Sequence, residues 1–326
     1  MTTLRKACRS CTSSKRKCIV QLPKCTRCAQ KGLECTYDLE PLRTASASPP
    51  DEAYAHKFNP SNGPDPGYCV MKTVRTRPYI DPEICDPGNA DVLGLIRQGF
   101  LTVPGLVRAG DPSTFVHPKL QLHAGYDHFA ALIRETGKIG MSLEGLAGLI
   151  QLDIRSAPVP EVLTALQALL IYLATFLYSP DPYGRSVAEG CLVVLSEWTQ
   201  TLYESARAGM PRNQSPWQDW LFGESARRTI VMAYALNMAL SATKDGYCSN
   251  WLFFESLPFD SRAGLWMAKS PQAWIAAAGA KSGGEVGEKL NSYHEFAERA
   301  AGGTEGDFCG DVFLRLLEYY HNGGPS

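Results

Sequence analysis

Six cysteines within the first 35 residues form a repeated pattern that restricts what this chain can fold into. The pattern, C-x2-C-x6-C-x6-C-x2-C-x6-C, contains two copies of one three-cysteine unit. The N-terminal sequence MTTLRKACRS has no apolar segment of the kind that directs secretion, so we expect the thiols to be reduced. In a reducing compartment, a dense cysteine repeat indicates a metal site rather than a disulfide framework. The six residues are Cys8, Cys11, Cys18, Cys25, Cys28 and Cys35.

The number of thiols predicts how many metal ions they hold. Zinc takes four tetrahedral ligands, so six cysteines form either one closed site with two spare thiols or two sites that share ligands. Two ions need eight ligand positions, so two sulfurs must bridge, and the first sulfur of each unit, Cys8 and Cys25, is best placed to do so. We therefore predict two zinc ions per chain. The predicted ligand sets are Cys8, Cys11, Cys18 and Cys25 for one ion, and Cys8, Cys25, Cys28 and Cys35 for the other.

Charge is distributed unevenly along the chain. Residues 1–43 contain ten Lys or Arg and only three acidic residues, a net charge of +7, whereas subtracting these from the totals of 32 and 33 leaves 22 basic and 30 acidic residues, a net of −8. A polyanionic partner is therefore expected for the N-terminal segment alone. Six thiolates and two divalent cations also sum to −2, so some of these basic residues would compensate the metal cluster.

The segment from residue 8 to residue 37 resembles the fungal zinc binuclear cluster (Zn2Cys6) transcription factors, whose DNA-binding domain has this cysteine spacing. Lys15 and Lys17 before the third cysteine, Pro23 between the halves, and the run PKCTRCAQKGLECTY are similar to that family. The chain departs from it at Thr12 and Ser14, where basic residues are common. This departure affects contacts with DNA and leaves the metal ligands intact.

The resemblance implies double-stranded DNA as the partner of the N-terminal segment. A short basic helix over residues 9–17 fits a major groove. In the family, the lysine that matches Lys15 reads a CGG triplet, so Lys15 is expected to contact base edges. Phosphate contacts supply affinity and salt dependence but little sequence information. They are expected from Lys17, Arg16, Arg9, Arg5 and Lys6, and from Lys24 and Arg27 in the second half.

Three domains are expected: a cluster domain at residues 1–40, a largely irregular Pro/Gly-rich linker at 41–112 and a helical regulatory domain at 113–326. Six prolines between residues 41 and 66 prevent a packed core there. Only Leu39 and Leu42 lie at heptad-like spacing, so no coiled coil is visible. A monomer on DNA and a homodimer formed through the helical domain both remain open.

The remainder of the chain predicts a mainly α fold. Apolar segments without strand-like alternation indicate helices over residues 119–136, 160–178, 186–208, 216–243 and 311–320. Residues 161–178 are apolar but interrupted by polar side chains, so we interpret them as a buried helix and expect no membrane partner. Glu224 lies three and four residues before Arg227 and Arg228, so it can pair with either on one helix face.

Motifs typical of enzymes are absent from the sequence. The six histidines form no H-E-x-x-H pair, GESAR at residues 223–227 lacks the closing glycine of a nucleophile elbow, and no phosphate-binding Gly-Lys-Ser loop occurs. Zinc sites closed by cysteines leave no open position for a substrate. We therefore expect that the protein is not an enzyme.

These features together predict a sequence-specific, nuclear regulator of RNA polymerase II genes. The run WQDWLFGESARRTIVMAYALNMAL, with KDGYC, LPFDSRAGLW and QAW after it, resembles the regulatory region of short family members found beside secondary-metabolite gene clusters. This resemblance implies control of such a cluster, with the helical domain contacting the transcription machinery or a coactivator. The alternative is a DNA-binding competitor or repressor without its own activation function, because no acidic-hydrophobic activation segment stands out.

Overall fold

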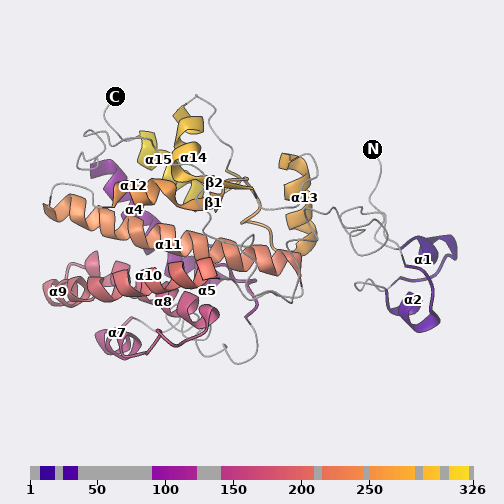
Figure 1. Cartoon of the computed structure of the whole chain (residues 1–326), viewed down its shortest axis with the longest axis horizontal. Coiled ribbons are helices and arrows are strands. Elements are labelled where there is room, and N and C mark those ends of the chain that lie inside the picture. The colour runs from indigo at the N-terminus through magenta and orange to yellow at the C-terminus, as the bar shows by residue number, and fades with distance from the viewer. Residues whose placement is uncertain are drawn as a thin grey trace. The chain divides into compact units, whose positions relative to one another are not determined.

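The computed structural model describes residues 8–18, 25–35, 90–122, 141–208, 215–245, 250–282, 289–301 and 308–322. The chain divides into two compact units. The cluster unit comprises residues 1–63 and 284–286, and the helical unit comprises residues 64–283 and 287–326. Helices predominate in the described residues (Figure 1), which confirms the predicted mainly α fold.

The residues of the cluster unit that the structure describes include two short helices, α1 (Arg9–Ser13) and α2 (Thr26–Lys31). Each helix starts directly after a cysteine, and α2 ends at Gly32, whose φ of +62° is the left-handed conformation common at helix C-termini. Four of the cysteines are fully buried, which leaves the sulfur cluster as the core of this unit.

The helical unit is built around α8 (Val159–Leu177). Pro160 and Glu161 in its first turn favour the start of a helix, and no glycine or proline interrupts the rest. The helix packs against α4, α7, α9, α10 and α11, and nearly all of its side chains from Val162 onward are buried. This helix is long and apolar enough to span a membrane, but most of it is buried inside the helical unit, as predicted for residues 161–178.

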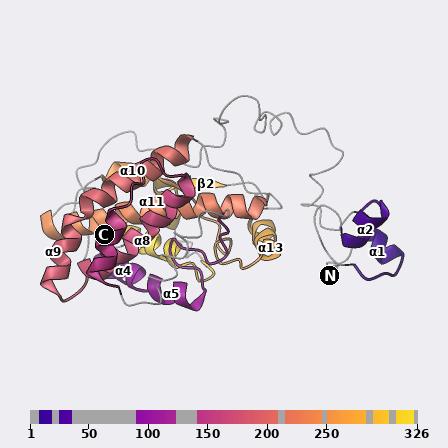
Figure 2. The same ribbon diagram turned by 90° about the horizontal axis from the view of Figure 1, so that it is seen from below.

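The longest of the described helices, α11 (Pro216–Asp245), crosses the helical unit beside α8 and α10 (Figures 1 and 2). In Figure 1, α7, α9 and α10 lie on one side of α11, and α12, α14 and α15 lie on the other. The remaining bounds are α4 Ala90–Leu101, α5 Val103–Ala109, α7 Leu143–Ile150, α9 Pro182–Gly190, α10 Leu192–Ala208, α12 Trp251–Ser256, α13 Pro271–Ser282, α14 Tyr293–Ala301 and α15 Val312–Asn322.

The boundary predicted for the linker at residue 112 needs correction. Helices α4 and α5 lie within the range 41–112 and belong to the helical unit, because α4 packs against α8, α11 and α15. The buried side chains of Ile96 and Phe100 join the main hydrophobic core. Two glycines inside α4 and the Val103-Pro104 start of α5 disguise these helices, since both residue types usually indicate loops.

The helix predicted over residues 119–136 is wrong for the residues that the structure describes. Residues 119–122 are not helical, and residues 123–136 lie outside the described ranges. Residues 112–117 form a buried, non-helical segment, and side chains distant in sequence bind two of its backbone carbonyls. Gln167 donates to the Phe115 carbonyl at 2.8 Å, and the indole of Trp266 donates to the Ser113 carbonyl at 2.6 Å. At residues 119–122 the side chain of Gln218 takes the place of helical hydrogen bonds: it donates to the Lys119 carbonyl at 2.9 Å and accepts from the Gln121 backbone N–H at 2.8 Å.

The predicted helix over residues 186–208 is divided into α9 and α10 at Cys191. Asp181 explains the earlier start, because its carboxylate accepts hydrogen bonds from the backbone N–H groups of Tyr183 and Gly184 and thereby caps α9. Pro182 follows at the first helical position, where proline is favoured.

A two-stranded antiparallel sheet of β1 (Pro258–Asp260) and β2 (Leu290–Ser292) was not predicted from the sequence. Each strand has three residues, too few for an alternating pattern to be recognised. The register pairs Phe259 with Asn291, and the sheet ends at Asp260. Strand β1 packs against α11, which brings Asp260 to the polar residues of that helix.

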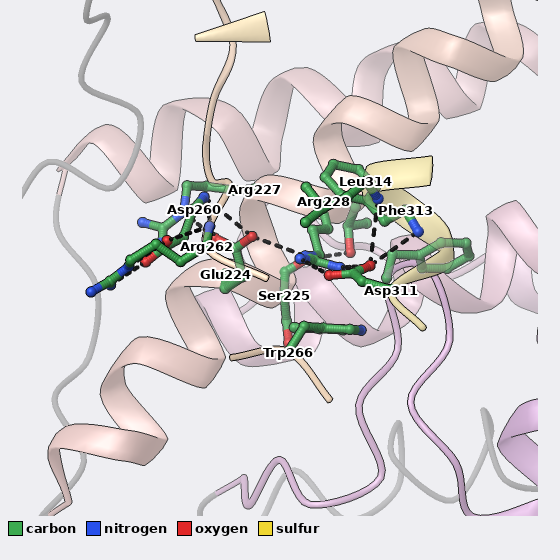
Figure 3. A network of polar contacts seen from close by, with 12 residues as sticks. Glu224, Ser225, Arg227, Arg228, Asp260, Arg262, Trp266, Asp311, Phe313 and Leu314 are labelled. Carbon is green, nitrogen blue, oxygen red and sulfur yellow. Dashed lines mark hydrogen bonds and ion pairs between the residues drawn. The ribbon is translucent and has the colours of Figure 1, made fainter. Parts of the chain in front are cut away.

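A buried ion network connects α11 with the residues after β1 and with α15 (Figure 3). Glu224 accepts hydrogen bonds from Nε of Arg227 and Nε of Arg228, both at 2.9 Å, and from the Asp260 backbone N–H at 3.1 Å. Asp260 in turn accepts from the Trp220 indole at 3.0 Å and from Nε of Arg262 at 2.8 Å. Glu224 therefore pairs with both arginines at once, where the sequence allowed for either.

Arg228 occupies the centre of this network. Its guanidinium donates two parallel hydrogen bonds to Asp311, at 2.9 and 2.8 Å, and lies 4.3 Å from the ring centroid of Trp266 and 4.5 Å from that of Phe313. Asp311 also accepts from the Phe313 backbone N–H at 3.1 Å, so the same carboxylate caps α15. A fully paired set of three arginines and three acids therefore joins three separate parts of the helical unit.

Candidate metal centre

The first two cysteines of each unit are positioned by the start of a helix. Cys8 precedes α1 and Cys25 precedes α2, both in an extended backbone conformation. Each sulfur accepts a hydrogen bond from the backbone N–H three residues later: Cys8 Sγ from Cys11 at 3.4 Å, and Cys25 Sγ from Cys28 at 3.3 Å. The C-x2-C spacing thus makes the first cysteine a helix cap and turns the second sulfur toward it.

The sulfur of the third cysteine in each unit lies beside the backbone N–H of the first cysteine. Cys18 Sγ accepts from the Cys8 backbone N–H at 3.5 Å, and Cys35 Sγ accepts from the Cys25 backbone N–H at 3.2 Å. The two halves therefore repeat one local arrangement with an offset of 17 residues, read from the separation of Cys8 and Cys25. The internal repeat found in the sequence is also a repeat in the structure.

The six sulfurs form two overlapping groups of four, and these are the two predicted sets. Within each group the sulfurs lie within 4.8 Å of one another, and Cys8 and Cys25 belong to both groups. Cys8 Sγ is 3.7 Å from Cys25 Sγ, which in turn is 3.7 Å from Cys11 Sγ. A tetrahedral zinc site with Zn–S bonds of about 2.3 Å requires sulfurs about 3.8 Å apart. The thiols therefore fit two zinc ions that share two ligands.

Burial and backbone hydrogen bonds shift the pKa values of these thiols in opposite directions. The hydrogen bond from the Cys28 backbone N–H lowers the pKa of Cys25 to about 6, even though burial opposes this effect. Burial raises the pKa of Cys28 to about 12 and also raises the pKa values of Cys8 and Cys18. Because zinc binds thiolates, the metal ions would supply the positive charge that permits all six thiols to ionise in a buried core.

The basic residues predicted to contact DNA occupy different environments. Lys15, Arg16 and Lys17 are exposed in the segment that follows α1. Arg27 on α2 is half-buried, and its guanidinium donates to Cys11 Sγ at 3.7 Å. Arg9 is the first residue of α1. Arg5, Lys6 and Lys24 lie outside the described residues.

Lys15 has a backbone conformation that is unusual for its type. Its φ is +50°, in the left-handed region, and the residue 17 positions later, at the matching place in the second half, is Gly32 with a φ of +62°. Glycine adopts this conformation at little cost, whereas other residues lose about 1–2 kcal/mol. The sequence already carries this signal, because superposing the two halves aligns Lys15 with a glycine.

Comparison with known proteins agrees with this geometry. Residues 6–44 match the model of the fungal Zn(2)-Cys(6) binuclear cluster domain. The chain is also similar to a protein of Penicillium aethiopicum named transcription factor gsfR2, with 24% identity over 349 residues that span 84% of this chain and 83% of that protein. No solved structure matches the chain.

Both findings bear on the predictions made from the sequence. The Zn(2)-Cys(6) domain binds two zinc ions through its six cysteines, which confirms the predicted cofactor. The family is non-enzymatic and the relative is named a transcription factor, so the exclusion of an enzyme is confirmed as well. With two zinc ions held in its N-terminal domain, the chain is a DNA-binding transcription regulator that fits the fungal Zn2Cys6 transcription factors.

Proposed function

We propose that this regulator acts in the nucleus on RNA polymerase II genes, that it reads CGG-type sites, and that it controls a secondary-metabolite gene cluster. The basic charge of residues 1–43 supports binding to DNA, since that segment carries +7 while the rest of the chain carries −8. The pathway rests on the resemblance of the segment that includes α11 to short regulators found beside such clusters.

The backbone conformation of Lys15 is the main observation that supports its proposed contact with DNA bases. Strained backbone of this kind is concentrated at functional sites, so the left-handed conformation of Lys15 supports a functional role for its side chain. Lys15 is exposed directly after α1, and its neighbours Arg16 and Lys17 are exposed too. A lysine can donate to the O6 and N7 acceptors of guanine, which are the acceptors that a CGG triplet presents in the major groove.

The remaining contacts follow from charge. Arg16 and Lys17 are assigned to phosphates, together with Arg9, Arg5, Lys6 and Lys24. Such contacts fix the register of the protein on the duplex without reading sequence. Cys8 and Cys25 are assigned as the bridging zinc ligands, because each sulfur is common to both groups of four.

The experiment for this function compares Lys15→Ala with Arg16→Ala in the full chain, on a CGG-containing duplex and on a duplex without CGG. Loss of a base contact costs about 1–3 kcal/mol on the CGG duplex and much less on the other. Loss of a phosphate contact weakens binding to both duplexes equally. Fluorescence anisotropy at fixed salt measures both, and an equal loss for Lys15→Ala on the two duplexes would contradict base reading.

A second candidate function is a competitor that binds DNA without activating transcription. It is favoured by the sequence of the helical unit, which has no evident acidic-hydrophobic activation segment. The first proposal requires this unit to contact a coactivator or the transcription machinery, or to form a homodimer. A reporter assay with the helical unit fused to an unrelated DNA-binding domain distinguishes the two, because a rise in transcription excludes the passive competitor.

A further inference from the structure

Arg27 contacts the metal cluster from the opposite half of the cluster unit. It lies on α2, yet its Nη1 donates to Cys11 Sγ at 3.7 Å and to Ser14 Oγ at 3.2 Å, both in the first half. The Ser14 hydroxyl donates to the Ser10 carbonyl at 2.6 Å, so its oxygen has a lone pair available for Arg27. The guanidinium is therefore held by two acceptors on α1 and its C-terminal end.

The two halves are joined in both directions, but only one of the joining residues is charged. The residue of α1 that matches Arg27 after the 17-residue offset is Ser10, whose hydroxyl donates to the Glu34 carbonyl in the second half. Arg27 thus adds one positive charge beside a thiolate cluster that, with two zinc ions, has a net charge of −2. A guanidinium is suited to this position because it stays protonated and donates several N–H groups in a fixed plane.

The sulfur that Arg27 contacts belongs to one zinc site only. Cys11 is a member of the group with Cys8, Cys18 and Cys25, and it is not in the other group. A hydrogen bond to a non-bridging thiolate withdraws charge from that sulfur and fixes its orientation, as partners outside the first coordination sphere do in metal sites generally. The contact therefore acts on one of the two metals.

We propose that Arg27 is a positioning residue of the zinc cluster, which holds the Cys11 thiolate and joins the two halves, instead of a contact to DNA phosphates. This assignment replaces the role expected for Arg27 from its charge alone. It also gives Ser14 a role, since a hydroxyl here accepts from Arg27 at a position where related proteins commonly have a basic residue. The proposal does not depend on which DNA sequence is read.

The test uses the zinc-loaded full chain with three variants: Arg27→Gln, Arg27→Lys and the charge-matched control Lys31→Gln. Lys31 is exposed on the same helix. The first measurement is the rate of zinc transfer to a chromophoric chelator. We expect Arg27→Gln to release one of the two ions about tenfold faster or more, in line with the usual effect of removing such a partner. Arg27→Lys should lie between Arg27→Gln and the unmodified chain, and Lys31→Gln should match the unmodified chain.

The second measurement reports on the sulfur itself. In chain loaded with Co2+ in place of zinc, Arg27→Gln should shift the thiolate-to-cobalt charge-transfer band, because removing a hydrogen bond makes the Cys11 sulfur a stronger electron donor. Lys31→Gln should leave the band in place. A general loss of folding would bleach the band without shifting it, so this readout separates a positioning role from mere destabilisation.

The third measurement addresses the alternative role. A residue that neutralises one phosphate contributes about 0.9 to the slope of log K against log salt on duplex DNA. We expect the slope of Arg27→Gln to equal that of the unmodified chain. The proposal is overturned if Arg27→Gln releases zinc at the rate of the Lys31→Gln control and its cobalt band is unshifted, whatever the salt slope. In that case, a slope reduced by about 0.9 would assign Arg27 to a phosphate contact. If Arg27→Gln does not fold, Arg27→Lys decides by the same zinc and cobalt measurements.

Discussion

At the scale of single residues, the sulfur atoms of Cys8 and Cys25 each have two functions. Cys8 and Cys25 cap their helices with their sulfurs and also belong to both groups of potential metal ligands. Their position before α1 and α2 is therefore fixed by the backbone as well as by the metal. The spacing alone was enough to predict the two overlapping groups of four sulfurs, because two ions and six thiols leave little freedom once the C-x2-C start of each half is recognised.

The bridging assignment predicts unequal effects of two cysteine substitutions. Cys8→Ser removes a ligand from both groups, whereas Cys18→Ser removes a ligand from one group only. We expect Cys8→Ser to lose both zinc ions and Cys18→Ser to retain one, because structural zinc provides the folding energy of such small domains. Elemental analysis of the purified chains measures this. Equal zinc content in the two variants would contradict the bridging role of Cys8.

Lys15 allows backbone strain to be separated from side-chain function. Both Lys15→Gly and Lys15→Ala remove the amine, but only glycine relieves the cost of a φ of +50°. We expect Lys15→Gly to stabilise the cluster unit by about 1 kcal/mol relative to Lys15→Ala, and both variants to lose preference for a CGG duplex. The chelator concentration that removes half of the zinc measures the first effect. Identical midpoints for the two variants would show that this position is not strained.

At the scale of elements, the sequence predicted α8, α11 and α15 well and predicted the region of residues 90–122 poorly. α8 and α11 are long and apolar, so their local preference agrees with their burial. In contrast, residues 112–117 are placed by side chains that are distant in sequence, such as Gln167 and Trp266. Such long-range bonds leave no periodic trace in the sequence. The partners of Glu224 were predictable on α11, but Asp260 and Asp311, which complete the network, were not.

The docking of α15 provides a prediction for that network. Asp311 caps α15 and also binds Arg228 through both of its oxygens. Asp311→Ala would remove the carboxylate that binds both Nη groups of the buried Arg228 guanidinium and leave it only the Glu224 contact at Nε, so we expect a loss of about 3 kcal/mol in the free energy of unfolding. Asp111→Ala is the control, because Asp111 pairs with Lys269 at the surface and such pairs contribute at most about 1 kcal/mol. Urea denaturation followed by tryptophan fluorescence measures both.

The buried segment at residues 112–117 predicts a dependence on pH. Burial, assisted by the charge of Arg228, lowers the pKa of His117 to about 4 from its usual 6.5. The unfolded chain takes up a proton as the pH falls through 6.5, but the folded chain does not until about pH 4. The stability provided by neutral His117 is therefore present above pH 6.5 and is lost as the pH falls toward 4, by up to about 3 kcal/mol.

His117→Gln tests this, because glutamine does not titrate and its oxygen can accept from the Lys119 N–H that His117 Nδ1 now accepts from. The variant should lose less stability than the unmodified chain between pH 6.5 and pH 4. All six tryptophans lie between residues 198 and 274, so their fluorescence reports on the helical unit. Parallel stability curves for the two chains would exclude His117 as the titrating group.

At the scale of the whole molecule, binding to DNA is expected only through the basic segment. The sequence predicted this from charge alone, because net charge needs no knowledge of the fold. The number of copies that bind one DNA site could not be predicted in the same way, because the sequence shows no coiled coil. The structure adds nothing on this point for residues 36–89, which lie outside the described ranges. The number of copies can be obtained from the salt dependence of the binding constant, because each copy that binds DNA releases its own counterions.

The salt dependence of DNA binding therefore counts the copies. Lys17→Gln removes one proposed phosphate contact per chain, so the slope of log K against log salt should fall by about 0.9 if one copy binds and by about 1.8 if two copies bind one site. Arg185→Gln, which removes an exposed charge from α9 in the helical unit, should leave the slope unchanged. Titrations of a CGG duplex by anisotropy at several salt concentrations measure both variants. An unchanged slope for Lys17→Gln would remove Lys17 from the interface, and a reduced slope for Arg185→Gln would mean that the acidic helical unit also contacts DNA.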